Sequence, residues 1–342
     1  MTYPTNPNDP DYVLAELLSH IEQRDATDSE SRAKTRLSSP RLGALKTSPS
    51  PVYMRPAAAF VRFLRKNHVV IYANSPSPTS TLTAPSNQGL LNTLESLPPE
   101  DLQSLITEFL KSHPVDAMLL AARLKGKTIS SDLSKADPFI RFAMYQVALG
   151  DENVCTFTVR LGQDFLERLS QRTHDNLSQL INDRVKTCLN EFLPGQAVPF
   201  WFVLENSGTD IAGFHIHGEV VADKDTLPLV KQAFEKTGLG YQQRWKNRRV
   251  HFGEPTLSST NRSGQCLSEV DNPERVSGSS MSFHWANYSA KDVKYVQSYW
   301  QSRDVRLGKL WKTSTGLNQE AAACLGLFKL LLDYQPARAG YA

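Results

Sequence analysis

Two short apolar runs, separated by a polar segment, form the clearest pattern in the chain. The first run covers residues 200–204 and ends in Glu205, and the second begins at Gly213 and carries His215 and His217. Apolar runs of this length, bounded by turn-forming residues, are typical of β-strands. We therefore predict a hairpin that turns through residues 206–210. Alternate residues of a strand share one face, so both histidines point the same way and Glu205 can lie beside them.

Strand and helix patterns alternate along the chain from about residue 152. The predicted strands are 153–160, 199–205, 212–221 and 281–285, and residues 241–252 are predicted to form a further hairpin or strand. The predicted helices are 164–193, 226–236, 290–301 and 317–333. This order is typical of the α+β class, with a central antiparallel sheet flanked by helices.

The first part of the chain has a different pattern. Residues 11–24, 57–65 and 89–125 have helical spacing of apolar positions, 68–72 resembles a short strand, and the Ser- and Pro-rich stretches 25–52 and 74–88 resemble linkers. We therefore predict three parts. They are a partly disordered, mostly helical accessory region at 1–140, a main domain at 150–325, and the end of the last helix with a tail at 326–342.

Composition narrows the class of protein only slightly. The formal net charge of +3 is compatible with a nucleic-acid partner but does not require one. The chain has no apolar stretch long enough to span a bilayer, no signal-peptide pattern at its start, and four cysteines without paired metal-type spacing. These features predict a cytoplasmic protein without a membrane partner, and they leave the oligomeric state open.

The histidine pair and the carboxylate suggest metal chemistry. Two imidazoles and one carboxylate on a rigid sheet suit a divalent ion that keeps open coordination positions. The mixed oxygen and nitrogen set of Glu205, His215 and His217 favours Mg²⁺ or Mn²⁺. The plainer interpretation is a surface pair, or a buried histidine with a satisfied hydrogen bond, next to an unrelated strand-end glutamate.

Tyr295 and Tyr299 are four residues apart and share one face of the predicted helix 290–301. Tyrosine is a weak nucleophile at neutral pH unless a neighbouring group or metal assists it. A tyrosine that attacks a phosphodiester would hold the cleaved strand as a phosphotyrosine ester. The plainer interpretation is that both rings pack on an amphipathic helix. Tyr288 is a third candidate, although it precedes the predicted helix.

These motifs resemble those of the HUH endonucleases, in particular the phage- and plasmid-type rolling-circle replication initiators with two tyrosines. Residues 156–159 resemble the first strand motif of that family. Glu205 followed by His215 and His217 resembles its metal motif, and the two tyrosines of 295–299 resemble its nucleophile helix. The resemblance covers about residues 150–325 and does not extend to residues 1–140.

The resemblance implies a function and a set of site residues. It implies metal-dependent nicking of single-stranded DNA and strand transfer through a 5′-phosphotyrosine, as in DNA replication of a mobile genetic element. Tyr295 would be the first nucleophile and Tyr299 the second, and single-stranded or hairpin DNA would be the partner. One departure is Ser298, which stands where the family often has a lysine. Lys291 and Lys294 are nearby and are candidates to replace it.

A basic and aromatic stretch at 241–249 suits contact with unpaired DNA. Arginines can bind phosphates there, and a tryptophan can stack on a base. The predicted nucleic-acid contacts are Arg244, Trp245, Lys246, Arg248, Arg249, Lys294, Arg303 and Arg306. A solvated hairpin is the plainer interpretation of the same stretch.

Two other classes of protein remain open. One is a non-catalytic DNA-binding regulator with the same fold, for which Ser298 would be a sign. The other is a cupin-like metal enzyme, which also places two histidines at alternate strand positions. That pattern expects a glutamate a few residues after the second histidine, and Glu219 is too close to His217 to fit it well.

Overall fold

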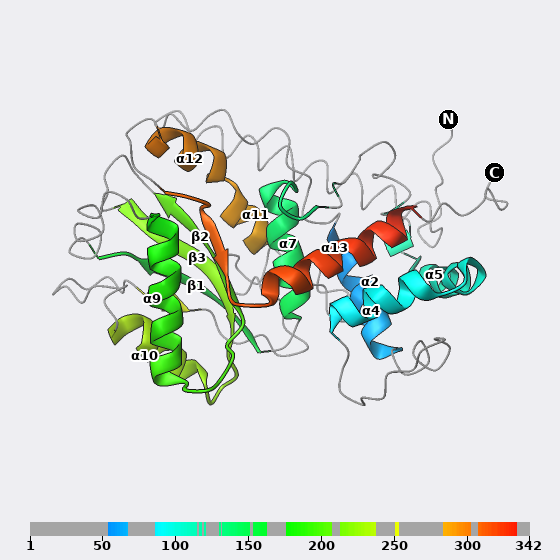
Figure 1. The fold of residues 1–342 in the computed structure, drawn as a ribbon, viewed down its shortest axis with the longest axis horizontal. Coiled ribbons are helices and arrows are strands. Elements are labelled where there is room, and N and C mark those ends of the chain that lie inside the picture. Colours follow the sequence, from blue (N-terminus) through cyan, green and yellow to red (C-terminus); the bar gives the residue numbers. More distant parts are fainter. Residues whose placement is uncertain are drawn as a thin grey trace, which may run out of the picture. The chain divides into compact units, whose positions relative to one another are not determined.

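A computed structural model describes residues 54–67, 86–114, 116–117, 120, 130, 132–150, 153–162, 176–206, 213–236, 250–252, 283–301 and 307–333 (Figure 1). The helices are α2 (Arg55–Lys66), α4 (Asn87–Ser96), α5 (Pro99–Ser112), α7 (Pro138–Leu149), α9 (Leu177–Phe192), α10 (Leu227–Lys236), α11 (His284–Ala290), α12 (Val293–Gln301) and α13 (Leu317–Asp333). The strands are β1 (Val154–Arg160), β2 (Phe200–Asn206), β3 (Phe214–Val221), β4 (Val250–Phe252) and β5 (Trp311–Thr313).

The strands form one five-stranded sheet in the order β4-β1-β3-β2-β5. Every neighbouring pair is antiparallel, which confirms the predicted α+β class with a central antiparallel sheet. β2 and β3 pair with Glu205 opposite His215 and Val203 opposite His217. β1 pairs with the other edge of β3 and places Thr158 opposite His217. The strand that carries both histidines is therefore the centre of the sheet.

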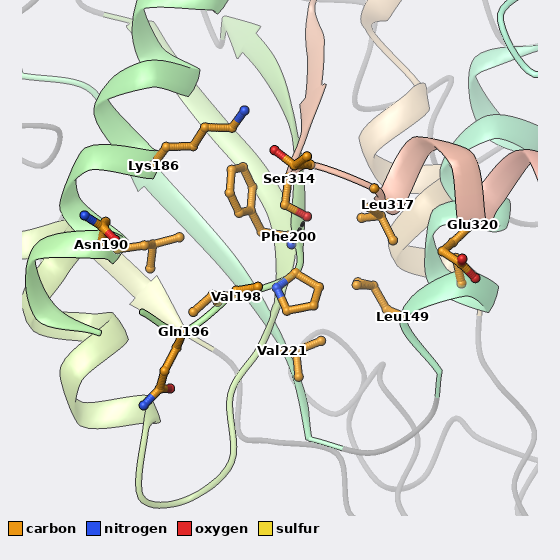
Figure 2. A pocket seen from close by; sticks show the side chains of 16 residues that line it. Leu149, Lys186, Asn190, Gln196, Val198, Phe200, Val221, Ser314, Leu317 and Glu320 are labelled. Carbon is orange, nitrogen blue, oxygen red and sulfur yellow. Dashed lines mark hydrogen bonds between the residues drawn. The ribbon is translucent and has the colours of Figure 1, made fainter. Parts of the chain in front are cut away.

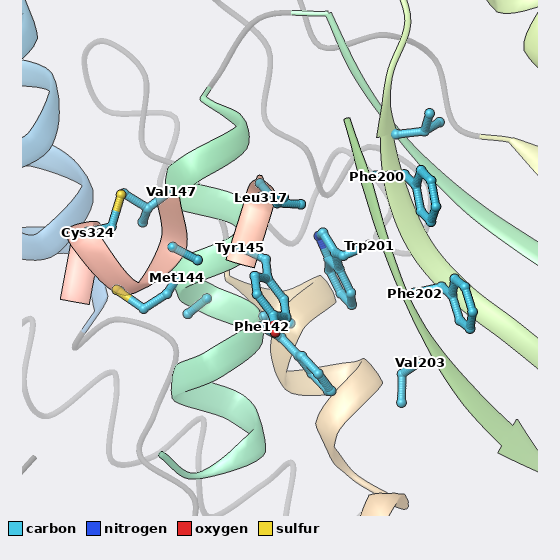
Figure 3. Packing of buried hydrophobic residues seen from close by; sticks show 14 of the residues in the cluster. Phe142, Met144, Tyr145, Val147, Phe200, Trp201, Phe202, Val203, Leu317 and Cys324 are labelled. Atoms are coloured by element: carbon cyan, nitrogen blue, oxygen red, sulfur yellow. The ribbon is translucent and has the colours of Figure 1, made fainter. Parts of the chain in front are cut away.

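Helices cover both faces of the sheet. On one face, the Phe157 and Phe234 rings lie 5.1 Å apart and bring α10 against β1. On the other face, the Trp201 ring of β2 stacks on Phe142 of α7 with ring centroids 5.1 Å apart (Figure 3). Because both faces are covered, all of β2 is buried, and its sequence is almost continuously apolar.

The helices that precede the sheet share its hydrophobic core. The buried apolar residues form one cluster, whose members range from Met54, just before α2, to Leu331 on α13. α13 packs against α2, α4 and α7, so helices from both ends of the chain meet there. Residues 48–342 form one compact unit, which includes α2, α4 and α5 from the expected accessory region. The separate role expected for residues 1–140 stays a prediction.

One predicted strand is wrong. Residues 284–290 form helix α11, whereas alternation of side-chain type over 281–285 predicts a strand. The buried positions explain the difference, since Phe283, Ala286 and Ser289 are buried at intervals of three residues. That spacing places them on one side of a helix, and Tyr288 is exposed between them.

Two elements have no counterpart among the predictions, and one of them has clear sequence signals. α7 begins after Asp137, whose side chain accepts a hydrogen bond from the Phe139 backbone N–H at 2.9 Å. Pro138 opens the helix, and Gly150, with a φ of 84°, follows its end. These are ordinary start and stop signals of a helix. The other element is β5, which is only three residues long.

The remaining elements agree with the predictions wherever they fall within the described residues. α13 covers the predicted helix 317–333, and α9 accounts for the second half of the predicted helix 164–193. The predicted helix at 11–24 and strand at 68–72 lie outside the described residues. Among the described helices, none has the length and apolar character needed to cross a membrane.

Candidate metal centre

The hairpin of β2 and β3 brings Glu205, His215 and His217 together, as the alternation of strand residues predicts. One ligand atom from each residue lies within 4.8 Å of the others. Oε2 of Glu205 is 3.7 Å from Nε2 of His215 and 3.5 Å from Nε2 of His217. A carboxylate oxygen and two imidazole nitrogens thus face one point on the sheet. This group can hold a metal ion.

Hydrogen bonds orient both imidazoles toward that point. Nδ1 of His215 lies 2.9 Å from the carbonyl oxygen of Gly213. A carbonyl only accepts, so Nδ1 carries the hydrogen and Nε2 of the neutral ring presents a lone pair. Nδ1 of His217 lies 2.6 Å from the hydroxyl oxygen of Thr158, which accepts equally well. Bonds of this kind to the far nitrogen are the usual support of metal-binding histidines.

Burial keeps His217 in the form that binds metals. Burial lowers the pKa of His217 well below its ordinary value of 6.5, and the neighbouring His215 and Lys291 lower it further. The ring is therefore neutral at physiological pH. Its Nε2 atom is buried and has no hydrogen-bond partner. A buried nitrogen lone pair without a hydrogen bond is costly, and a metal ion would satisfy it.

Helix α11 closes over the histidines. Nε1 of Trp285 donates a hydrogen bond to the carbonyl oxygen of Gly218 at 3.0 Å, which fixes the helix to β3. Gly218 is needed for the tight packing of the sheet, because a Cβ there would lie 2.0 Å from the carbonyl oxygen of Trp201. Nζ of Lys291, just after α11, is 4.0 Å from Oε2 of Glu205.

The tyrosines differ in their distance from the cluster. Tyr288 is 42% exposed and its ring centroid lies 5.2 Å from that of His217. It also stacks on Trp285, with centroids 5.5 Å apart. Tyr295 and Tyr299 lie on α12, as predicted, and their half-buried rings stack on each other at 5.6 Å. Tyr288 therefore has a ring contact to the cluster, and the roles of Tyr295 and Tyr299 stay predictions.

Most of the predicted nucleic-acid contacts lie outside the described residues. These are Arg244, Trp245, Lys246, Arg248, Arg249, Arg303 and Arg306. Lys294 is described, and it is exposed on α12, the helix that carries the two tyrosines.

The family resemblance includes Thr158 within residues 156–159 and makes Lys291 a candidate for the family's lysine, but the sequence predicts no contact of either residue with the candidate ligands. Thr158 reads as a strand former, and only the register of β1 against β3 shows that it meets His217. Lys291 is one of several lysines on the chain, and only the packing of α11 places it near Glu205. A strand register from the hydrophobic pattern would have found Thr158. No sequence signal predicts the contact of Lys291 with Glu205.

Glu219 has a different role from Glu205. It shares a face of β3 with both histidines but is fully buried. It accepts hydrogen bonds from Nε2 of Gln146 at 2.7 Å and from Nε1 of Trp201 at 2.9 Å. This carboxylate therefore ties α7 to the sheet. The cupin-like alternative, which needs a later glutamate as a metal ligand, gains no support from this arrangement.

A separate cavity of about 390 Å³ lies at the opposite end of the hairpin (Figure 2). Pro199 and Phe200 at the start of β2 and Val221 at the end of β3 contribute to its wall. Glu205 lies five residue steps along β2 from Phe200, which corresponds to about 17 Å. The cavity is thus distinct from the metal cluster.

No protein-family model, no curated protein and no solved structure matches this chain. The chemistry of the site is therefore the basis for a functional conclusion.

Proposed function

We propose that the chain is a metal-dependent endonuclease that nicks single-stranded DNA and transfers the cleaved strand through a phosphotyrosine ester. The observation that carries this proposal is the cluster of Glu205, His215 and His217, which lies beside helix α11 and its Tyr288. The resemblance of the motif order to rolling-circle replication initiators supports the same reaction. Replication of a mobile element is the biological setting that this resemblance favours.

The protein's part in the proposed reaction is to hold the metal ion and to orient the side chains that bind it. Glu205, His215 and His217 would bind Mg²⁺ or Mn²⁺, which when bound polarises a phosphodiester and stabilises developing charge. Thr158 and the carbonyl of Gly213 keep the two imidazoles aimed at one point. The buried side of the site excludes water from the ligands. The exposed side, where Tyr288 lies, is open to a nucleic-acid strand.

The covalent step forms one bond and breaks another. The tyrosine oxygen attacks phosphorus, the bond from phosphorus to the 3′ oxygen breaks, and that oxygen leaves with a proton as a 3′ hydroxyl. We assign the first attack to Tyr295 and the second to Tyr299, which lie one helical turn apart on α12. Two tyrosines permit two successive strand transfers. Tyr288 is the competing candidate, because its ring contacts His217.

A direct experiment is incubation of the protein with pooled single-stranded oligonucleotides and Mn²⁺, followed by mass spectrometry of tyrosine-linked nucleotides. We expect an adduct on a tyrosine of α12 and none in the Glu205→Gln variant. An adduct on Tyr288 would keep the reaction and change the nucleophile. If a pool of all short sequences gave neither an adduct nor cleavage, the proposed endonuclease activity would be refuted.

A non-catalytic DNA-binding protein is the second candidate. It is favoured by the stacking of Tyr295 on Tyr299, because half-buried stacked rings also serve simply to pack a helix. Ser298, in place of the lysine expected from the resemblance, points the same way. Binding of single-stranded DNA without metal-dependent cleavage would identify this class.

A further inference from the structure

Lys291 faces the same carboxylate oxygen as the two imidazoles. Its Nζ atom is 4.0 Å from Oε2 of Glu205, the oxygen that lies 3.7 Å from His215 and 3.5 Å from His217. A divalent ion held by these ligands would bind that oxygen. The ammonium group and the ion are therefore directed at the same acceptor.

Glu205 and Lys291 differ in their exposure to solvent. The Glu205 side chain is only 3% exposed, so its negative charge needs a positive partner nearby. The Lys291 side chain is 25% exposed, and its ammonium lies 3.1 Å from the Tyr288 ring centroid. A long flexible stem at the solvent boundary lets the ammonium leave the carboxylate without unfolding anything.

We propose that Lys291 competes with the divalent ion for Glu205 and moves onto a DNA phosphate when the ion is bound. Binding of the metal and binding of the phosphodiester are then coupled, each strengthening the other. This inference rests on the proposed metal site, but it does not depend on cleavage or on which tyrosine reacts.

Electrostatics give the size of the effect. A divalent ion lies about 2.1 Å from a carboxylate oxygen, so an ion on Oε2 of Glu205 would lie no more than about 6 Å from the Lys291 ammonium. Repulsion between such charges at that separation, even at the dielectric constant of water, weakens binding about tenfold. A phosphate placed between the two cations removes this repulsion. Linkage requires that the metal strengthen phosphate binding by the same factor.

The test measures Mn²⁺ affinity of the full chain by electron paramagnetic resonance, which detects free Mn²⁺. Without DNA, Lys291→Met is expected to bind Mn²⁺ about tenfold more tightly than the wild type. Addition of a short oligothymidylate should raise Mn²⁺ affinity in the wild type by a larger factor than in Lys291→Met. Lys291→Gln removes the same charge and should behave like the methionine variant if that variant folds poorly.

Two controls separate the possible failures. Lys224→Met removes the same charge from an exposed turn after β3 and should keep the wild-type Mn²⁺ affinity. Glu205→Gln should lose Mn²⁺ binding. If wild type and Glu205→Gln bind Mn²⁺ equally, the metal site is wrong and Lys291 has no role in it. If Glu205→Gln loses binding but both Lys291 variants bind like the wild type or more weakly, the competition alone is wrong.

Discussion

Replacement of Thr158 with valine removes one hydroxyl group from the support of the metal centre and keeps the shape of the side chain. That hydroxyl lies 2.6 Å from Nδ1 of His217, whose imidazole is buried. In the variant, Nδ1–H would have no acceptor in its place. A buried polar group that loses its hydrogen bond costs about 1–3 kcal/mol. We therefore expect the free energy of unfolding to fall by about that amount.

Metal affinity should fall as well, because the imidazole loses the group that fixes its orientation. Loss of a hydrogen bond to a metal-binding histidine typically weakens metal binding roughly 10–100-fold. Urea denaturation measures the first effect, and Mn²⁺ binding followed by electron paramagnetic resonance measures the second.

Thr156→Val is the matched control for this prediction. Thr156 shares the face of β1 with Thr158 and is equally half-buried, but it lies opposite Glu219 instead of His217. Its replacement should leave Mn²⁺ affinity unchanged. Equal Mn²⁺ affinities for the two valine variants would refute the role of the Thr158 hydroxyl in orienting His217.

Three further outcomes are expected. Tyr295→Phe should abolish the covalent DNA adduct, whereas Tyr299→Phe should leave the first cleavage intact and impair the second strand transfer. Denaturing gels and mass spectrometry would show both effects, and the opposite pattern would make Tyr299 the first nucleophile. Because folding lowers the pKa of His217 well below 6.5, the unfolded chain binds more protons at acid pH. Stability without metal should therefore fall as pH drops below 6.5, and His217→Asn should flatten this dependence in urea titrations. Gly218→Ala should destabilise the fold by about 3 kcal/mol, because its methyl group would lie 2.0 Å from a backbone carbonyl oxygen; a thermal melt like that of the wild type would contradict this.

The hairpin and its ligands were predictable because their signals are local. Alternation alone places His215 and His217 on one face, and the antiparallel pairing of β2 with β3 puts Glu205 opposite His215. Helix α13 was equally clear, since its apolar residues keep helical spacing over seventeen residues. In each case the pattern is set by neighbours in sequence, and tertiary contacts only reinforce it.

The surroundings of the ligands could not be derived in the same way. The segment at 281–285 alternates in polarity like a strand, yet α11 packs against α7 and Phe283 and Ala286 are buried, so its later residues are helical. That change turns Tyr288 from a residue before the predicted nucleophile helix into a tyrosine beside His217. Lys291 likewise gains its place only from the docking of α11. Side chains brought in by docked helices depend on contacts between distant segments, which a single sequence does not display.

The position of the ligands within one hairpin has a consequence for folding. All three come from a segment of thirteen residues, 205–217, whereas the helices above them are contributed about seventy residues later. Contacts between residues close in sequence cost little chain entropy, and a hairpin closes in roughly 1–10 μs. The ion can therefore be captured while the nascent chain still lacks α11 and α12. Under the proposed function, a truncated chain would then retain the metal while losing the tyrosines, and metal loading would precede catalytic competence during synthesis.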